Sequence, residues 1–185
     1  MKSVLVIYGT TEGQTRKIAE FITDALKARG AEVELVDSAS ERAAQVQPVY
    51  AAAIVCGSLH QSRFQSSLLH FLKANQGWLA GIPTVFIAVS LTAALDDDQS
   101  RAELQKLAEA FCAEAAWTPA TTRQVAGALR YSQYDYFKRL IMKLIARQHG
   151  DDTDTSHDYE YTDWDDLTRF VEAFLAAHSV QAGHR

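Results

Sequence analysis

The sequence predicts an α/β fold, a doubly wound sheet of five parallel strands with helices on both faces. Runs of β-branched and apolar residues alternate with helical patterns along the chain, which is typical of parallel sheets. The first and fourth expected strands, residues 3–8 and 83–90, are apolar, as in sheets that helices cover on both faces. The chain has 185 residues, 48% hydrophobic and 22% charged, so we expect a single globular domain over residues 1–185.

Hydrophobic spacing in the first half of the chain predicts three strands and two helices. The first strand is residues 3–8. The helix at residues 15–29 has apolar side chains at helical spacing and ends before Gly30. The remaining elements of this half are strands at residues 32–36 and 49–56 and a helix from residue 64 to about residue 75.

The second half predicts two more strands and two more helices. A fourth strand covers residues 83–90, and the acidic run 96–98 precedes a helix to about residue 117, where carboxylates suit the helix dipole. A fifth strand is expected at residues 121–126, and a last helix begins at Asp163. Between them, residues 127–162 form one long insertion.

The net charge of −5 is distributed unevenly along the chain. Residues 123–147 hold six Lys and Arg and one acid, whereas residues 151–166 hold eight acids and no Lys or Arg. A basic block inside an acidic chain indicates a local partner and argues against general nucleic-acid binding. The acidic segment lacks the ligand spacing of an EF-hand, so we assign no metal site.

The sequence also indicates the cellular compartment in which the protein is expected. No window approaches the roughly 20 apolar residues of a membrane span, and the apolar stretch after Met1 is too short for a signal peptide. Cys56 and Cys112 lie in apolar stretches without a CxxC partner, so we expect two core residues and no disulfide or metal site. These features predict a cytoplasmic protein.

The loop after the first strand carries a phosphate-binding pattern. In this architecture ligands bind beyond the carboxyl ends of the strands, so the loops after the first, third and fourth strands matter most. Three threonines, two glycines and a helix N-terminus lie within residues 9–15, and together they favour an anion. The simpler alternative is that these hydroxyls only cap a helix. A P-loop is excluded, and the GxGxxG of dinucleotide sites is missing.

Residues 9–15 resemble the FMN-phosphate loop of flavodoxins, a Ser/Thr-x-Thr-Gly-x-Thr run. The resemblance implies that the chain binds FMN non-covalently. Glu12 stands where electron-carrying flavodoxins mostly have Thr, and its carboxylate would repel a phosphate unless it points outward. The residues that the resemblance assigns to the phosphate are Thr10, Thr11, Glu12, Gly13, Gln14 and Thr15.

Later segments resemble one branch of this fold, the flavodoxin-like menaquinone-dependent protoporphyrinogen IX dehydrogenases of bacterial haem synthesis. The matching stretches are residues 125–131, 142–145, 152–155 and 161–164, together with the acidic residue and Gly-Gln-Thr-Arg at Glu12 to Arg16. The resemblance implies oxidation of protoporphyrinogen IX to protoporphyrin IX, with electrons passed to menaquinone or ubiquinone. No catalytic residue is assigned.

Two further loops are expected to enclose the flavin ring. By the same resemblance, Ser58, Leu59, His60 and Gln61 wrap one edge of the ring, with backbone groups of residues 57–60 toward flavin N5. Leu91, Thr92 and Ala93 lie on the other side, where carriers usually stack an aromatic ring, so the flavin face is open to a substrate. We interpret His60 as a packing or solvent residue. Arg63 is either a surface cation or a contact for an anionic group such as a porphyrin propionate.

Residues 131–149 within the insertion predict a basic amphipathic helix. Three interpretations stay open: a helix packed on the core, a peripheral contact with an anionic membrane on the cytoplasmic face, or a surface for the anionic porphyrinogen. The candidate substrate or membrane residues are Arg63, Arg130, Tyr131, Lys138, Arg139, Lys143 and Arg147.

Two rival functions remain at this point. The first is a flavodoxin-type electron carrier or an NAD(P)H-dependent FMN reductase. The second is a flavin-free interaction domain that has kept the fold, because a fold never guarantees a function.

Overall fold

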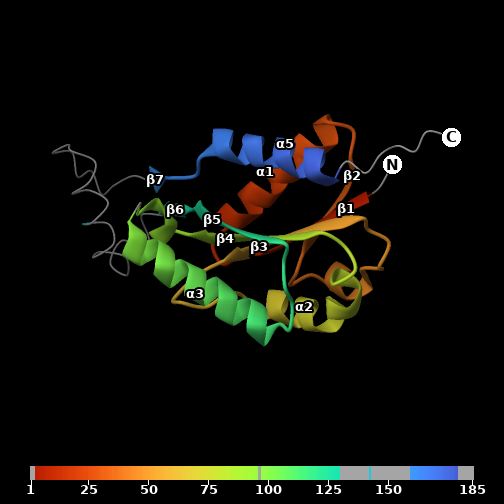
Figure 1. The fold of residues 1–185 in the computed structure, drawn as a ribbon, viewed down its shortest axis with the longest axis horizontal. Coiled ribbons are helices and arrows are strands. Elements are labelled where there is room, and N and C mark those ends of the chain that lie inside the picture. The colour runs from red at the N-terminus through yellow and green to blue at the C-terminus, as the bar shows by residue number, and fades with distance from the viewer. Residues whose placement is uncertain (1–2, 96, 130–141, 143–158, 179–185) are drawn as a thin grey trace.

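The computed structural model describes residues 3–95, 97–129, 142 and 159–178. Its centre is a five-stranded parallel sheet, and Figure 1 shows helices covering both faces of this sheet. The strands are β1 (Ser3–Gly9), β2 (Glu32–Asp37), β3 (Ala52–Ser58), β4 (Thr84–Ser90) and β5 (Thr121–Ala126). The helices are α1 (Gln14–Ala28), α2 (Ser66–Leu79), α3 (Asp98–Glu114) and α5 (Trp164–His178), with short 3₁₀ turns η1 (Glu41–Gln45) and η2 (Thr92–Ala94).

The strand order is β2-β1-β3-β4-β5, and every neighbouring pair is parallel. This order confirms the predicted doubly wound sheet. The chain first moves outward from β1 to β2 and then returns to the other side of β1, so the order reverses between β1 and β3. Ligands of such sheets bind at this reversal, outside the carboxyl ends of the strands.

Each face of the sheet has its own hydrophobic core, because successive side chains of a strand point to opposite faces. Leu5 and Ile7 of β1 face α2 and α3, whereas Val4 and Val6 face α1 and α5. Cys112 belongs to the first cluster and Cys56 to the second, and both thiols are free and buried. Burial raises the pKa of both, that of Cys112 to about 11, which fits the predicted core role.

Some boundaries differ from the sequence prediction. The third strand was expected from residue 49, but β3 begins at Ala52, and Val49 has 70% of its surface exposed. The helix expected to end near residue 75 continues to Leu79, since Leu79 is buried at the end of α2. Asn75 and Gly77 are poor helix formers, but packing against the core outweighs their propensity.

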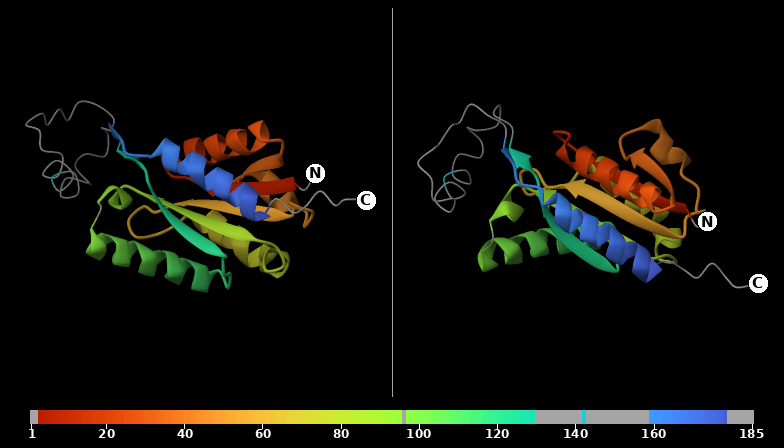
Figure 2. Two further views of the ribbon diagram at one scale, coloured as in Figure 1. Left: turned by 45° about the horizontal axis from the view of Figure 1, so that its top comes forward. Right: turned by 90° about the horizontal axis from the view of Figure 1, so that it is seen from above.

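Helices α1 and α5 lie side by side over one face of the sheet, as Figure 2 shows. The rings of Phe21 and Trp164 are 4.9 Å apart, and Arg29 Nη2 lies 2.6 Å from Glu172 Oε1. The side chain of Asp163 caps α5 by accepting the Asp166 N–H at 2.8 Å. The last helix therefore starts where the sequence predicts.

A small antiparallel ribbon at the base of the insertion was not predicted. Its strands are β6 (Ala128–Leu129) and β7 (Tyr159–Glu160), too short to give a periodic signal. The expected basic helix at residues 131–149 lies outside the described residues, apart from residue 142, and so do the predicted roles of Arg130, Tyr131, Lys138, Arg139, Lys143 and Arg147. In the part of the chain that is described, no helix is long and apolar enough to cross a membrane.

The ion pair between Arg123 on β5 and Asp166 on α5 makes stability depend on pH. The hydrogen bond from Arg123 lowers the pKa of Asp166 below its ordinary value of 3.8. A carboxyl group whose pKa is lower in the folded state stabilises the fold above its unfolded pKa, and this contribution is lost as the pH falls through the folded pKa.

We therefore predict that Asp166→Asn lowers the melting temperature by about 1–4 °C at pH 7. The difference from the unmutated protein should shrink as the pH falls below 3.8, followed by circular dichroism. Asp165→Asn is the control, since this exposed residue shares the first helical turn and reports the helix-dipole effect. A difference that stays constant with pH would contradict the assignment.

Candidate functional site

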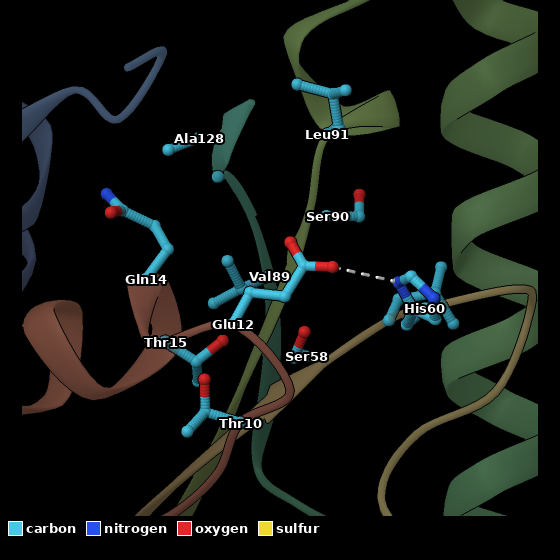
Figure 3. A pocket seen from close by; sticks show the side chains of 12 residues that line it. Thr10, Glu12, Gln14, Thr15, Ser58, His60, Val89, Ser90, Leu91 and Ala128 are labelled. Carbon is cyan, nitrogen blue, oxygen red and sulfur yellow. Dashed lines mark ion pairs between the residues drawn. The ribbon is translucent and has the colours of Figure 1, made fainter. Parts of the chain in front are cut away.

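The predicted ligand loops converge on one hollow at the carboxyl edge of the sheet. Figure 3 shows side chains from the loops after β1, β3 and β4 facing it together with the residues that follow β5. The lining residues are Thr10, Glu12, Gln14, Thr15, Ser58, Leu59, His60, Val89, Ser90, Leu91, Gly127 and Ala128. Of the predicted cofactor residues, Thr11, Gly13, Gln61, Thr92 and Ala93 lie beside this lining.

The β1–α1 loop presents a helix N-terminus to the hollow. Gly13 adopts the left-handed conformation, φ 92°, and donates its N–H to Thr10 Oγ1 at 2.9 Å. Helix α1 begins at Gln14, and the Lys17 N–H donates to the Gly13 carbonyl at 3.0 Å. The N–H groups of the first helical turn have no acceptor within a helix, so they and the nearby hydroxyls suit an anion.

Glu12 faces the hollow instead of pointing away from it. Its side chain crosses toward His60, with Glu12 Oε1 at 3.6 Å from His60 Nδ1 (Figure 3). The two side chains are 23% and 29% exposed. This contact with His60 accompanies the inward direction of the carboxylate. An anion bound at α1 would share this hollow with Glu12.

Gln65 joins two of the loops and was missed by the sequence analysis. Its Oε1 accepts the Ser58 N–H at 3.1 Å, while its Nε2 donates to the Ser58 carbonyl at 2.9 Å and to Thr11 Oγ1 at 3.0 Å. A Cβ added at Gly9 would lie 3.0 Å from Gln65 Oε1, so the close approach favours glycine there. Thr11 and Gln65 are 54 positions apart, and no local pattern signals such a bond.

The β3–α2 loop closes in a tight turn between His60 and Arg63. Each donates its N–H to the other's carbonyl, at 2.9 and 3.0 Å, and the central residues Gln61 and Ser62 have φ of 49° and 59°. Left-handed residues other than glycine are strained and often mark functional sites. The turn puts Gln61 and Arg63 on the exposed side, and Arg63 lines a separate groove between α2 and α3.

The backbone N–H groups expected to meet the flavin are engaged within the protein. The Ser58 N–H donates to Gln65 Oε1 at 3.1 Å, the Leu59 N–H to the Val89 carbonyl at 2.7 Å, and the His60 N–H to Arg63. These bonds fix the loop rigidly. A ligand at this edge therefore meets side chains and carbonyl groups, and not these three donors.

On the side of the hollow opposite the β3–α2 loop, Leu91 follows β4, and only 8% of its surface is exposed. It packs with Leu95 and Leu129 in a small cluster of its own. The Ala93 N–H donates to Ser90 Oγ at 3.1 Å within the turn that contains η2. Of the three residues expected on this side of the ring, Leu91 lines the hollow, whereas Thr92 and Ala93 do not.

Comparison with known proteins agrees with this architecture. The model of the flavodoxin domain family matches residues 5–156. Two solved structures share the fold: an apo NADH:FMN oxidoreductase (TM-score 0.56, 13% identity, 98% of this chain and 92% of that chain) and the oxidised flavodoxin 2 of Bacillus cereus (TM-score 0.51, 17% identity, 78% and 99%). At such identities the likeness concerns the fold alone.

Two relatives match over nearly the whole chain. The protoporphyrinogen IX dehydrogenase [quinone] of Escherichia coli K12 is 28% identical over 167 residues, which cover 90% of this chain and 91% of the relative. The protein of the same name from Leishmania major is 30% identical over 176 residues, covering 93% of this chain and 74% of the relative. The resemblance found in the sequence is thereby confirmed. The chain belongs to the flavodoxin domain family and, within it, to the protoporphyrinogen IX dehydrogenase [quinone] family.

Proposed function

We propose that this chain binds FMN non-covalently in the hollow, oxidises protoporphyrinogen IX to protoporphyrin IX and passes the electrons to a quinone. The reaction is the one named for its relatives over about 90% of the chain. The observation that carries the proposal is the β1–α1 loop, where threonine hydroxyls surround a helix N-terminus beside the reversal of strand order.

The residues of this loop fit the phosphate of FMN. The hydroxyl groups of Thr10 and Thr15 line the hollow, and the first N–H groups of α1 supply further donors. Thr15 is only 1% exposed, so water competes little for its hydroxyl. Thr11, Glu12, Gly13 and Gln14 complete the predicted set, with Gly13 supplying the left-handed turn.

The loops after β3 and β4 would hold the flavin ring between them. Leu59 and Leu91 offer apolar contact to the ring, and Ser58 and His60 offer polar groups. FMN supplies two-electron chemistry, so the six-electron oxidation of the porphyrinogen requires three cycles. The chain's own contribution is to fix the ring and the substrate relative to each other and to limit water.

The proposal also covers the electron acceptor, a quinone, and the place where the protein meets it. Menaquinone and ubiquinone dissolve in lipid, so a protein that reduces them must reach a bilayer surface. We assign this contact to residues 130–147, whose cations would attract anionic lipids. Co-sedimentation with vesicles of anionic lipid at low and at high salt tests that contact.

The reaction itself is tested without oxygen by mixing the FMN-loaded protein with protoporphyrinogen IX. We expect the flavin absorbance to bleach while porphyrin fluorescence rises, and the absorbance to recover when a menaquinone analogue is added. The protein without FMN is the control and should form no porphyrin. A flavin that stays oxidised beside intact porphyrinogen would refute the proposed reaction, and bleaching by NADPH alone would favour an FMN reductase.

The charge of Glu12 gives a second prediction. Because the carboxylate shares the hollow with the phosphate, Glu12→Gln should lower the Kd for FMN about threefold to tenfold at low salt, and less at high salt. Quenching of FMN fluorescence measures the Kd. Glu20→Gln is the matched control, since Glu20 lies on α1, pairs with Arg16 and is 44% exposed. Weaker FMN binding by Glu12→Gln would show that the carboxylate helps to hold the flavin.

A further inference from the structure

The end of the insertion, at Thr162, contacts the first turn of α1. Gln14 Nε2 donates to Thr162 Oγ1 at 2.9 Å, and the Thr162 hydroxyl donates to the carbonyl of Ala126 at 2.8 Å. Two hydrogen bonds thus connect the start of α1, through Thr162, to the end of β5. Thr162 is only 8% exposed, so water competes little for its hydroxyl. Gln14 and Thr162 are 148 positions apart in the chain.

A second contact lies one helical turn further along α1. Lys17 Nζ lies 2.6 Å from Glu160 Oε2, and Trp164 Nε1 donates to Glu160 Oε1 at 2.6 Å. Lys17 also lies 5.1 Å from the centre of the Trp164 ring. Both Glu160 oxygens are therefore used, and the hydrogen bond from Lys17 is the main cause of the lowered pKa of Glu160. The pair is partly exposed and contributes little energy, but it fixes where β7 lies beside α1.

Backbone hydrogen bonds fix the same segment to the strands that line the hollow. The Tyr161 N–H donates to the Gly127 carbonyl at 3.0 Å, and the Gly127 N–H donates to the Ser90 carbonyl at 3.0 Å. Tyr161, the residue before Thr162, is therefore held to Gly127 after β5 and through Gly127 to the end of β4, while Thr162 itself bonds to α1, the helix that follows β1. In this way Thr162 connects the β1 side of the hollow with its β4 and β5 side.

We propose that Thr162 is a positioning residue for the phosphate loop. By holding Gln14, it keeps the first turn of α1 at the orientation in which its N–H groups meet the flavin phosphate. The inference rests on the proposed FMN binding. Orienting donors only at the moment of binding costs conformational entropy, so donors held in place in advance bind more tightly. Thr162 is outside the lining of the hollow and acts through Gln14.

The proposed role of Thr162 concerns the phosphate alone, so an experiment can separate it from a general role of Thr162 in folding. FMN and riboflavin share the ring, and only FMN carries the phosphate. Thr162→Val keeps the shape of the side chain and removes both hydrogen bonds. We expect the Kd for FMN to rise about threefold to tenfold, the factor that one hydrogen bond is worth, while the Kd for riboflavin stays within twofold. Thr162→Ser keeps the hydroxyl and should restore the Kd for FMN.

Asp166→Asn is the matched control. Asp166 lies in the first turn of α5, shortly after Thr162, and pairs with Arg123 of β5, so its loss should leave both Kd values unchanged. If Thr162→Val does not fold by circular dichroism, Thr162→Ala takes its place. An unmutated protein that does not bind FMN would refute the proposed function. If it does bind FMN, an unchanged Kd in Thr162→Val, or an equal loss of riboflavin and FMN affinity, would overturn the inference alone.

Discussion

The parallel pairing of β1 with both β2 and β3 determines where every other part of the site lies. Leu5, Val6 and Ile7 are completely buried, and a shift of one residue in register would move each of these side chains to the opposite face of the sheet and into the other core. In this register Tyr8 lies opposite Asp37 on one side and Cys56 on the other. The loops that follow β1 and β3 therefore leave the sheet at the same edge, and the hollow forms between them.

The phosphate loop is held at both ends by side chains from distant parts of the chain. Gln65, just before α2, bonds to Thr11, and Thr162, at the end of the insertion, bonds to Gln14. The loop between these two anchors contains Glu12 and the left-handed Gly13. A loop fixed in this way keeps its donors oriented before any ligand arrives, which reduces the entropy lost on binding. Thr162, the last residue of the insertion, thus bonds to Gln14, which lines the hollow.

Local patterns predicted the sheet, most of the helices and the three loops that meet at the hollow. Apolar runs such as that of β4 are strong signals, since β4 buries all of its side chains. The contacts of Gln65 and Thr162 could not be predicted, because each joins residues far apart in sequence. The engaged N–H group of Leu59 was missed for the same reason, because its acceptor, the Val89 carbonyl, lies on β4. The contact of the inward-facing Glu12 with His60 is one that a local pattern also cannot show.

The central claim is that the flavin is held by its phosphate at the N-terminus of α1. A crystal structure of the chain with FMN tests it most directly. The account predicts the phosphate within hydrogen-bonding distance of the Thr10 and Thr15 hydroxyls and of the first N–H groups of α1. It also predicts that the bond between Gln14 and Thr162 persists in the complex. A phosphate bound away from residues 10–15 would contradict the account.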